Sequence, residues 1–181
     1  MPLFGAQRDL RNLLREKAGE DNVKWTIVST GIFMSFLFEQ FWGIVDRRKE
    51  GEGEVVVRCL RGWDHKVTVT DVGDIGRVLA RIIAGDAEAG NRVLYIAGDT
   101  VSYGQLAGIV KRVSGKDVKQ EVWSIPHLKS ELEAAPDDGI KKYRLVFARD
   151  GVWWEKDRTV NKALGMEMMD VETFARGLFS K

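Results

Sequence analysis

The stretch VKWTIVSTGIFMSFLFEQFWGIV, residues 23–45, decides the predicted fold class. Its first part, residues 23–30, is rich in β-branched residues, which is typical of a buried strand. This run ends at Gly31. Residues 32–45 are apolar on nearly every side, which predicts a helix that is deeply buried or lines a cavity or an interface. A strand followed by such a helix indicates an α/β protein.

The chain downstream continues this alternation. Further strands are predicted at residues 54–60, 65–70, 92–99 and 117–125, and helices at 72–85, 102–115, 126–134, 139–147 and 171–180. Ser102 and Gln105 form a capping box, and Gly115 ends the helix that they begin. Asp71 or Thr70 is predicted to cap the helix at 72–85. The alternation predicts an α/β sheet with parallel pairing.

The segment before the first strand is predicted to be an amphipathic helix. Its apolar residues, Leu3, Ala6, Leu10, Leu13 and Leu14, recur at helical spacing. No strand precedes this helix in the sequence, which raises the question of what its apolar face packs against.

Composition restricts the class of protein. Among 181 residues, 28 Lys and Arg balance 27 Asp and Glu, so no basic excess indicates a nucleic-acid partner. The single Cys59 excludes an intramolecular disulfide and fits a reducing compartment. Glu39 and Gln40 interrupt the longest apolar stretch, which falls short of a membrane span. We therefore expect one globular domain, residues 1–181, in the cytoplasm, with no nucleic acid or membrane as partner.

Motifs of common chemistry are missing from the sequence. It contains neither G-x-G-x-x-G nor G-x-x-x-x-G-K-[ST], and no Tyr-x-x-x-Lys dyad. His65 and His127 have no Cys or His at ligand spacing, so no metal site is predicted. His127 is a candidate for proton transfer, or a locally hydrogen-bonded residue at a helix start. The six tryptophans fit either a pocket for a flat organic ligand or an ordinary core.

Four stretches carry a family resemblance, at residues 25–39, 67–83, 91–116 and 141–154. In order and spacing they resemble the NmrA-like branch of the isoflavone-reductase family, the atypical short-chain dehydrogenases, especially fungal members. The resemblance covers residues 3–180. It implies the C-terminal part of an NAD(P)-binding Rossmann-like fold with a small substrate-side α+β region. It also implies that residues 3–16 form the helix that follows the Gly-rich Rossmann half, so the chain is expected to begin in the middle of the family's domain.

The resemblance further implies roles for particular residues. Those matching family positions near the nicotinamide and the substrate are Ser29, Thr30, Gly31, Ile32 and Phe33. The substrate side would be lined by Met34, Trp63, His127 and Trp153. Gln7 stands where the family carries its proton-transferring lysine. A glutamine amide can hydrogen-bond a carbonyl but cannot exchange a proton near neutral pH.

Three hypotheses of function stay open at this stage. The first is an NAD(P)H-dependent reductase of small aromatic or secondary-metabolite substrates, with NADP as the cofactor. The second is a non-catalytic ligand-binding or redox-sensing regulatory protein. The third is a cofactor-free isomerase or cyclase that uses His127 or a carboxylate as base. Because the phosphate cradle is missing, we expect the chain alone to bind NADPH weakly or not at all. We also expect a homo-oligomer or a protein partner, because strand edges and the apolar face of residues 3–14 would otherwise be bare.

Overall fold

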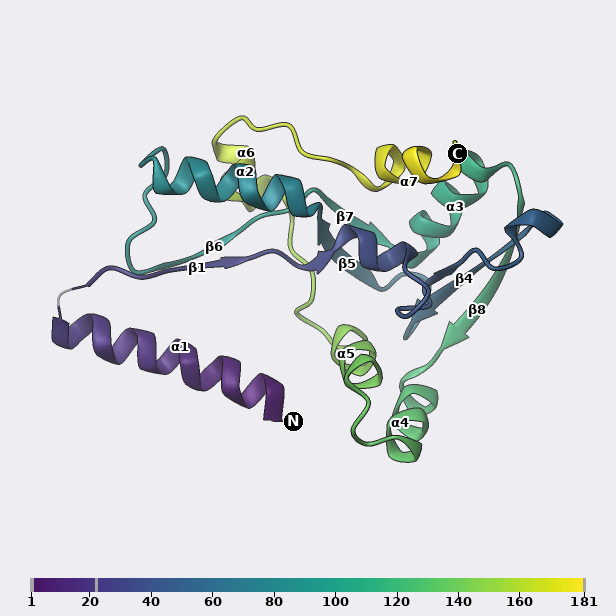
Figure 1. Cartoon of the computed structure of the whole chain (residues 1–181), viewed down its shortest axis with the longest axis horizontal. Helices are drawn as coiled ribbons and strands as arrows, with labels where there is room; N and C mark the ends of the chain where they lie inside the picture. The colour runs from purple at the N-terminus through teal and green to yellow at the C-terminus, as the bar shows by residue number, and fades with distance from the viewer. Residues whose placement is uncertain (1, 22, 181) are drawn as a thin grey trace.

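The computed structural model describes the backbone of residues 2–21 and 23–180, and the side chains of residues 8–19 and 23–180. The helices are α1 (Pro2–Asp21), α2 (Val72–Ile83), α3 (Tyr103–Ser114), α4 (Ile125–Ala134), α5 (Gly139–Phe147), α6 (Val160–Ala163) and α7 (Val171–Phe179), with 3-10 turns η1 (Met34–Phe38), η2 (Glu50–Glu52) and η3 (Lys156–Arg158). The strands are β1 (Thr26–Ser29), β2 (Ile32–Phe33), β3 (Val45–Asp46), β4 (Glu54–Leu60), β5 (Lys66–Thr70), β6 (Arg92–Tyr95), β7 (Asp99–Ser102) and β8 (Asp117–Trp123) (Figure 1).

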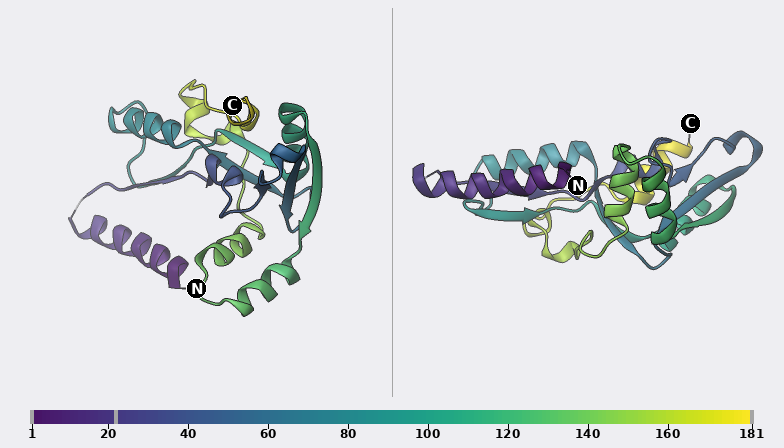
Figure 2. Two further views of the ribbon diagram at one scale, coloured as in Figure 1. Left: turned by 45° about the vertical axis from the view of Figure 1, so that its right-hand side comes forward. Right: turned by 90° about the horizontal axis from the view of Figure 1, so that it is seen from below.

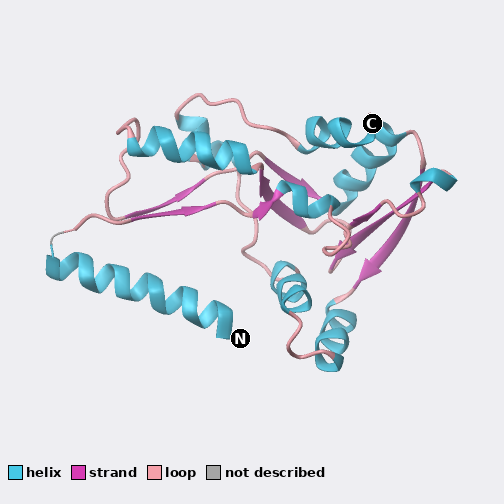
Figure 3. Cartoon of the chain, in the orientation of Figure 1, coloured by secondary structure: helices cyan, strands magenta, loops and turns pink. Residues whose placement is uncertain are grey.

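The described strands form small mixed sheets, which appear in magenta in Figure 3. β1 pairs with β6 in parallel, β5 lies between β2 and β7, and β4 lies between β3 and β8. The β2–β5 and β4–β8 pairs are parallel, whereas β3–β4 and β5–β7 are antiparallel. The prediction of an α/β fold is confirmed, and the predicted parallel pairing is found in three of the five described strand pairs, while the other two are antiparallel. Residues 61–65 connect β4 to β5 by a turn, which is too short for the helical crossover that neighbouring parallel strands need. β5 pairs instead with β2 and β7.

The local signals at helix ends are confirmed. Ser102 accepts a hydrogen bond from the Gln105 amide, and the Gln105 side chain accepts one from the Ser102 amide. Gly115 ends α3 in the left-handed conformation, with φ of 64°. Asp71 caps α2 through the amides of Gly73 and Asp74. These motifs are formed by residues close to one another in the sequence, and they can therefore be predicted from the sequence alone.

The prediction of a helix over residues 32–45 is wrong. This segment forms β2, the η1 turn and β3, joined by a bend at Gly43, whose φ is 74°. The side chains of Met34, Leu37, Trp42 and Ile44 are all buried in one core. An apolar run without clear periodicity fits short turns as well as a helix, and here the tertiary packing decides between them.

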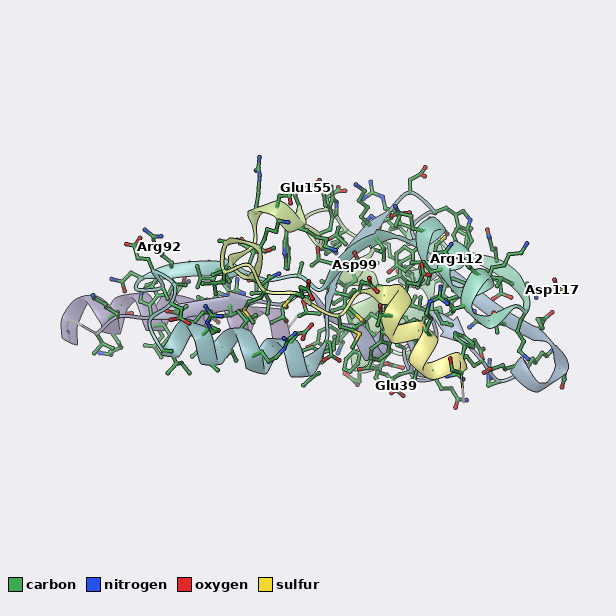
Figure 4. The ribbon with its side chains drawn as sticks, turned by 90° about the horizontal axis from the view of Figure 1, so that it is seen from above. Glu39, Arg92, Asp99, Arg112, Asp117 and Glu155 are labelled. Atoms are coloured by element: carbon green, nitrogen blue, oxygen red, sulfur yellow. The ribbon has the colours of Figure 1, made fainter. Side chains whose placement is uncertain are left out.

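The core gathers around β4, on which α3 packs, while α7 packs against α3. Val55, Val57 and Cys59 of this strand are fully buried. α7 is held at its start by Asp99, whose Oδ2 accepts from the Val171 amide (3.2 Å). Arg112 of α3 pairs with Glu172 of α7, and Figure 4 shows both Asp99 and Arg112 beside this C-terminal helix.

The other end of the molecule is much less covered. The described leucines of α1, Leu10, Leu13 and Leu14, are exposed, as expected for a bare apolar helix face. β1 was predicted to be buried, but its residues are half-buried or exposed because β6 is its only partner among the described strands. α1 lies beside this two-stranded sheet, and the start of the helix points toward α4 and α5 in both panels of Figure 2.

Candidate functional site: an aromatic cleft behind the first strand

Residues 29–33 run from the end of β1 through Thr30 and Gly31 into β2, and they form the mouth of the site. We call this segment the 29–33 turn. Its Gly31 has φ of 70°, and a Cβ built there would lie 2.2 Å from the carbonyl oxygen of Thr68. The hydroxyl of Thr70 donates to the carbonyl of Thr30 (2.7 Å). The turn therefore lies directly on β5, at a distance that only glycine permits.

A cleft of about 750 Å³ opens behind this turn. Its lining combines the end of β1, the turn, the bend before β3, α5, the segment after α5, and one residue of α1: Arg11, Val28, Ser29, Thr30, Gly31, Ile32, Phe33, Phe36, Phe41, Trp42, Ile140, Tyr143, Phe147, Gly151, Val152 and Trp154. The volume lies within the range of small-molecule sites.

A chain of ring contacts forms what we call the aromatic wall: Phe33, Phe36, Phe41, Trp42 and Phe147. The centroid of Phe36 is 5.3 Å from that of Phe33 and 5.1 Å from that of Phe41, both edge-on. Trp42 meets Phe147 edge-on at 6.0 Å. Edge-to-face packing fixes ring orientations and leaves apolar faces for a flat guest.

Polar groups in the cleft are few. Among the lining side chains that the structure describes, only Arg11 and Tyr143 are ionisable. The indole N–H of Trp154 donates to the carbonyl of Ile96 (3.2 Å), whereas that of Trp42 is buried without a partner in the described part of the chain. The arrangement can hold a planar organic molecule by contact with rings and orient it through a small number of hydrogen bonds.

The comparison with known protein families shows which family the chain belongs to. The model of the NmrA-like family matches residues 1–172. The chain belongs to the NmrA-like family. An NmrA-like family domain-containing oxidoreductase of Gibberella moniliformis is 38% identical over 176 residues, which are 96% of this chain and 54% of that protein. The chain thus spans about half the length of this relative.

Solved structures agree on the fold. AtPrR2 with NADP+ and (+)-pinoresinol matches 99% of this chain and 59% of its own, with a TM-score of 0.72 and 14% identity. Isoflavone reductase matches 92% and 56%, with a TM-score of 0.70 and 12% identity. The NADPH-dependent quinone oxidoreductase QOR2 of Escherichia coli, in complex with NADPH, matches 91% and 57%, with a TM-score of 0.67 and 19% identity. These likenesses confirm the predicted Rossmann-like α/β fold class.

The structure brings residues 29–33 together at the cleft, but not Met34, Trp63, His127 or Trp153. Met34 is fully buried in the core, where its Cε would lie 3.1 Å from a Cβ at Gly98. Trp63 also packs against the core, and Trp153 lies under the ammonium of Lys66, 4.6 Å from the ring centroid. Neither Met34, Trp63 nor Trp153 is among the cleft-lining residues.

Of the two candidate catalytic residues, His127 is not among the residues that line the cleft. His127 lies in a second groove, where its ring stacks on Trp123 and its Nε2 is 4.0 Å from Glu131. Gln7 lies within α1, four residues before Arg11, but its side chain is outside the described residues. Among the described residues, no group of three or more His, Cys, Asp or Glu could hold a metal ion. No described helix is long and apolar enough to cross a membrane.

Sequence reasoning missed the contribution of α5. Ile140, Tyr143 and Phe147 all line the cleft and stand at helical spacing i, i+3 and i+7. This spacing was a usable signal for one apolar helix face. It does not reveal which surface the face meets, because that depends on contacts distant in sequence.

Proposed function

We propose that the chain provides the nicotinamide and substrate side of an NAD(P)H-dependent reductase. The observation that carries this proposal is the 29–33 turn, where Gly31 lies against β5 at the mouth of an aromatic cleft. Membership of the NmrA-like family supports it, as does the oxidoreductase relative from a fungus. The proposed substrates are small aromatic molecules, because the aromatic wall offers ring faces and few polar groups.

The residues present fit the nicotinamide end of the cofactor. Gly31 lets the turn lie against Thr68 of β5 at the edge of the cleft, and Phe33 stands at the mouth with a partly exposed side chain. NAD(P)H, when bound, supplies the hydride of a reduction. This chain's residues would hold the ring edge, exclude water with the aromatic wall, and orient the substrate through Arg11 and Tyr143.

A second candidate is a non-catalytic ligand-binding or redox-sensing protein. Gln7 favours it, because this glutamine occupies the position at which the family resemblance implies a proton-transferring lysine. The cofactor-free isomerase hypothesis is not favoured, since His127 lies in another groove. Our proposal keeps a cytoplasmic location, supported by the single, buried Cys59.

The proposal predicts an unusual cofactor preference for residues 1–181 alone. NADPH, NADH and reduced nicotinamide mononucleotide should all bind with a Kd of about 1 mM or weaker, within about threefold of one another. The reason is that only the nicotinamide end, which all three share, meets the chain. Quenching of tryptophan fluorescence measures the affinities.

Variants make this measurement specific to the cleft. Phe33→Ser should abolish the quenching, while Val122→Ser, at an exposed position outside the cleft, should leave it unchanged. Tenfold tighter binding of NADPH than of the mononucleotide would show that this chain holds the adenosine end as well, and no quenching by any of them would refute the proposal.

We further propose that the open β1 edge and the leucines of α1 are covered by a protein partner, either a second copy or a dinucleotide-binding half. Unpaired strand edges and exposed apolar side chains both favour association with another chain. The purified chain should be oligomeric by light scattering at micromolar concentration. Replacing both Leu10 and Leu14 by Glu should shift it toward the monomer, whereas Ile83→Glu, on α2, should not. A wild-type monomer would contradict this prediction.

A further inference from the structure

Arg144 lies on α5 next to a cleft residue, Tyr143, but its side chain reaches a different part of the site. Its Nε donates to the carbonyl oxygen of Trp42 (2.9 Å) and its Nη2 to that of Phe41 (2.8 Å). The side chain is only 12% exposed. One guanidinium thus holds two consecutive carbonyls whose own side chains belong to the aromatic wall.

The next carbonyl along the chain is held by a second arginine. Arg58 of β4 donates from Nη1 to the carbonyl of Gly43 (3.0 Å). Its guanidinium is fixed in turn by Glu121 (2.7 Å) and Asp46 (3.2 Å). The bend at residues 41–43 is therefore anchored at every carbonyl, from α5 on one side and from β4 on the other.

Trp123 lies close to both guanidiniums. Arg144 is 4.5 Å and Arg58 is 5.3 Å from the centroid of its ring. An arginine guanidinium can lie over an aromatic ring and bind two acceptors at once through its rigid fork. Burial is the main cause that lowers the pKa of Arg144, with the neighbouring Arg58 acting in the same direction.

Gly43 completes the arrangement. Its φ is 74°, and a Cβ there would lie 3.1 Å from Nη2 of Arg144 and 3.1 Å from Cη2 of Trp123. A side chain at this position would push against both the guanidinium and the indole on which it stacks. Because Gly43 has no side chain, the Arg144 guanidinium has space to reach from α5 to the bend.

We propose that Arg144 is a positioning residue that fixes the spacing between α5 and the Phe41 and Trp42 rings, and so makes the cleft selective for planar molecules. The inference rests on the proposed function in one respect, that the cleft is the ligand site. α5 contributes Tyr143 and Phe147 to the lining, and the bend contributes Phe41 and Trp42. Without the tie, the two parts of the lining can move relative to each other, and a bulky guest is accommodated as well as a flat one.

The test compares Arg144→Met with Arg47→Met in the full chain. Arg47 is a matched control, because it also donates to a backbone carbonyl (Leu178, 3.0 Å), pairs with a carboxylate (Glu50, 2.7 Å) and stacks on a ring (Phe179, 4.4 Å). The probes are 2-naphthol, which is planar, and 1-adamantanol, which is not. The wild type and Arg47→Met should prefer 2-naphthol at least tenfold, and Arg144→Met less than threefold. Equal preferences in all three proteins would overturn the proposal.

Hydrogen exchange separates this inference from the proposed function. In Arg144→Met the amides of residues 41–44 should exchange at least tenfold faster than in the wild type, while those of α7 should not change. Gly43→Ala should reproduce this local effect with the arginine still present. If neither probe binds the wild type, the proposed function fails, but faster exchange would still support the positioning role. Unchanged exchange at residues 41–44 would overturn that role whatever the probes do.

Discussion

Replacing Gly31 by alanine is expected to destabilise the protein by about 3 kcal/mol or more and to abolish binding in the cleft. A left-handed backbone at a residue with a Cβ costs about 1–2 kcal/mol. The new Cβ would also lie 2.2 Å from the oxygen and 2.7 Å from the carbon of the Thr68 carbonyl. This carbonyl belongs to β5, which is paired on both sides with β2 and β7 and cannot move away cheaply. The turn must therefore move away from β5, and this movement distorts the mouth of the cleft.

Urea denaturation measures the loss of stability, and the mononucleotide titration measures the loss of binding. Gly76→Ala is the matched control, since Gly76 lies inside α2 with no atom within 4 Å of a built Cβ. That substitution should stabilise the protein by about 0.5–1 kcal/mol, because alanine is the better helix former. A midpoint for Gly31→Ala equal to that of the wild type would show that the turn is not held against β5.

The fold was predictable where neighbours in the sequence determine the structure. The Ser102 and Gln105 box and the end of α3 at Gly115 are local motifs, and the predicted helices after residue 70 are found. Residues 32–45 could not be predicted in this way. Whether Phe36 and Trp42 follow a helix or a bend depends on contacts distant in sequence, such as those of Arg144, about a hundred residues away, with the carbonyls at the bend.

The site was only partly predictable. The 29–33 turn came from the family resemblance, while Met34, Trp63 and Trp153 shared its neighbourhood in that comparison without lining this cleft. The burial of charged residues was the feature that the sequence indicated least well. Asp46 stands in the polar run DRRKEGEGE, which indicates a surface loop, yet its side chain is only 8% exposed. Its burial depends on β3 pairing with β4, which brings Arg58 next to it.

This buried carboxylate leads to the second large effect. Asp46 accepts hydrogen bonds from the side chain of Arg48 (Nε, 2.9 Å), from the Arg48 amide (3.1 Å) and from Arg58 (3.2 Å). The hydrogen bond from the Arg48 side chain is the main cause that holds the pKa of this carboxyl well below its usual range, against the opposing effect of burial. The amide of Arg48 and the guanidinium of Arg58 add to the lowering. Asp46 therefore stays ionised in the folded protein at every ordinary pH.

Asp46→Asn should lower the free energy of unfolding at pH 7 by about 3 kcal/mol, as expected when one partner of a buried ion pair is removed. The loss should be pH-dependent. Because folding lowers this pKa, the carboxylate stabilises the fold fully above the unfolded-state value of about 3.9 and progressively less as the pH falls below it. Denaturation of both proteins between pH 3 and 7 should thus show a gap that is constant above pH 5 and narrows below about pH 4. Asp150→Asn, whose carboxylate is 91% exposed beside Arg61, should change stability by less than about 1 kcal/mol. A gap for Asp46→Asn as small as this control's would mean that Arg58 and the bend it anchors do not depend on the buried charge.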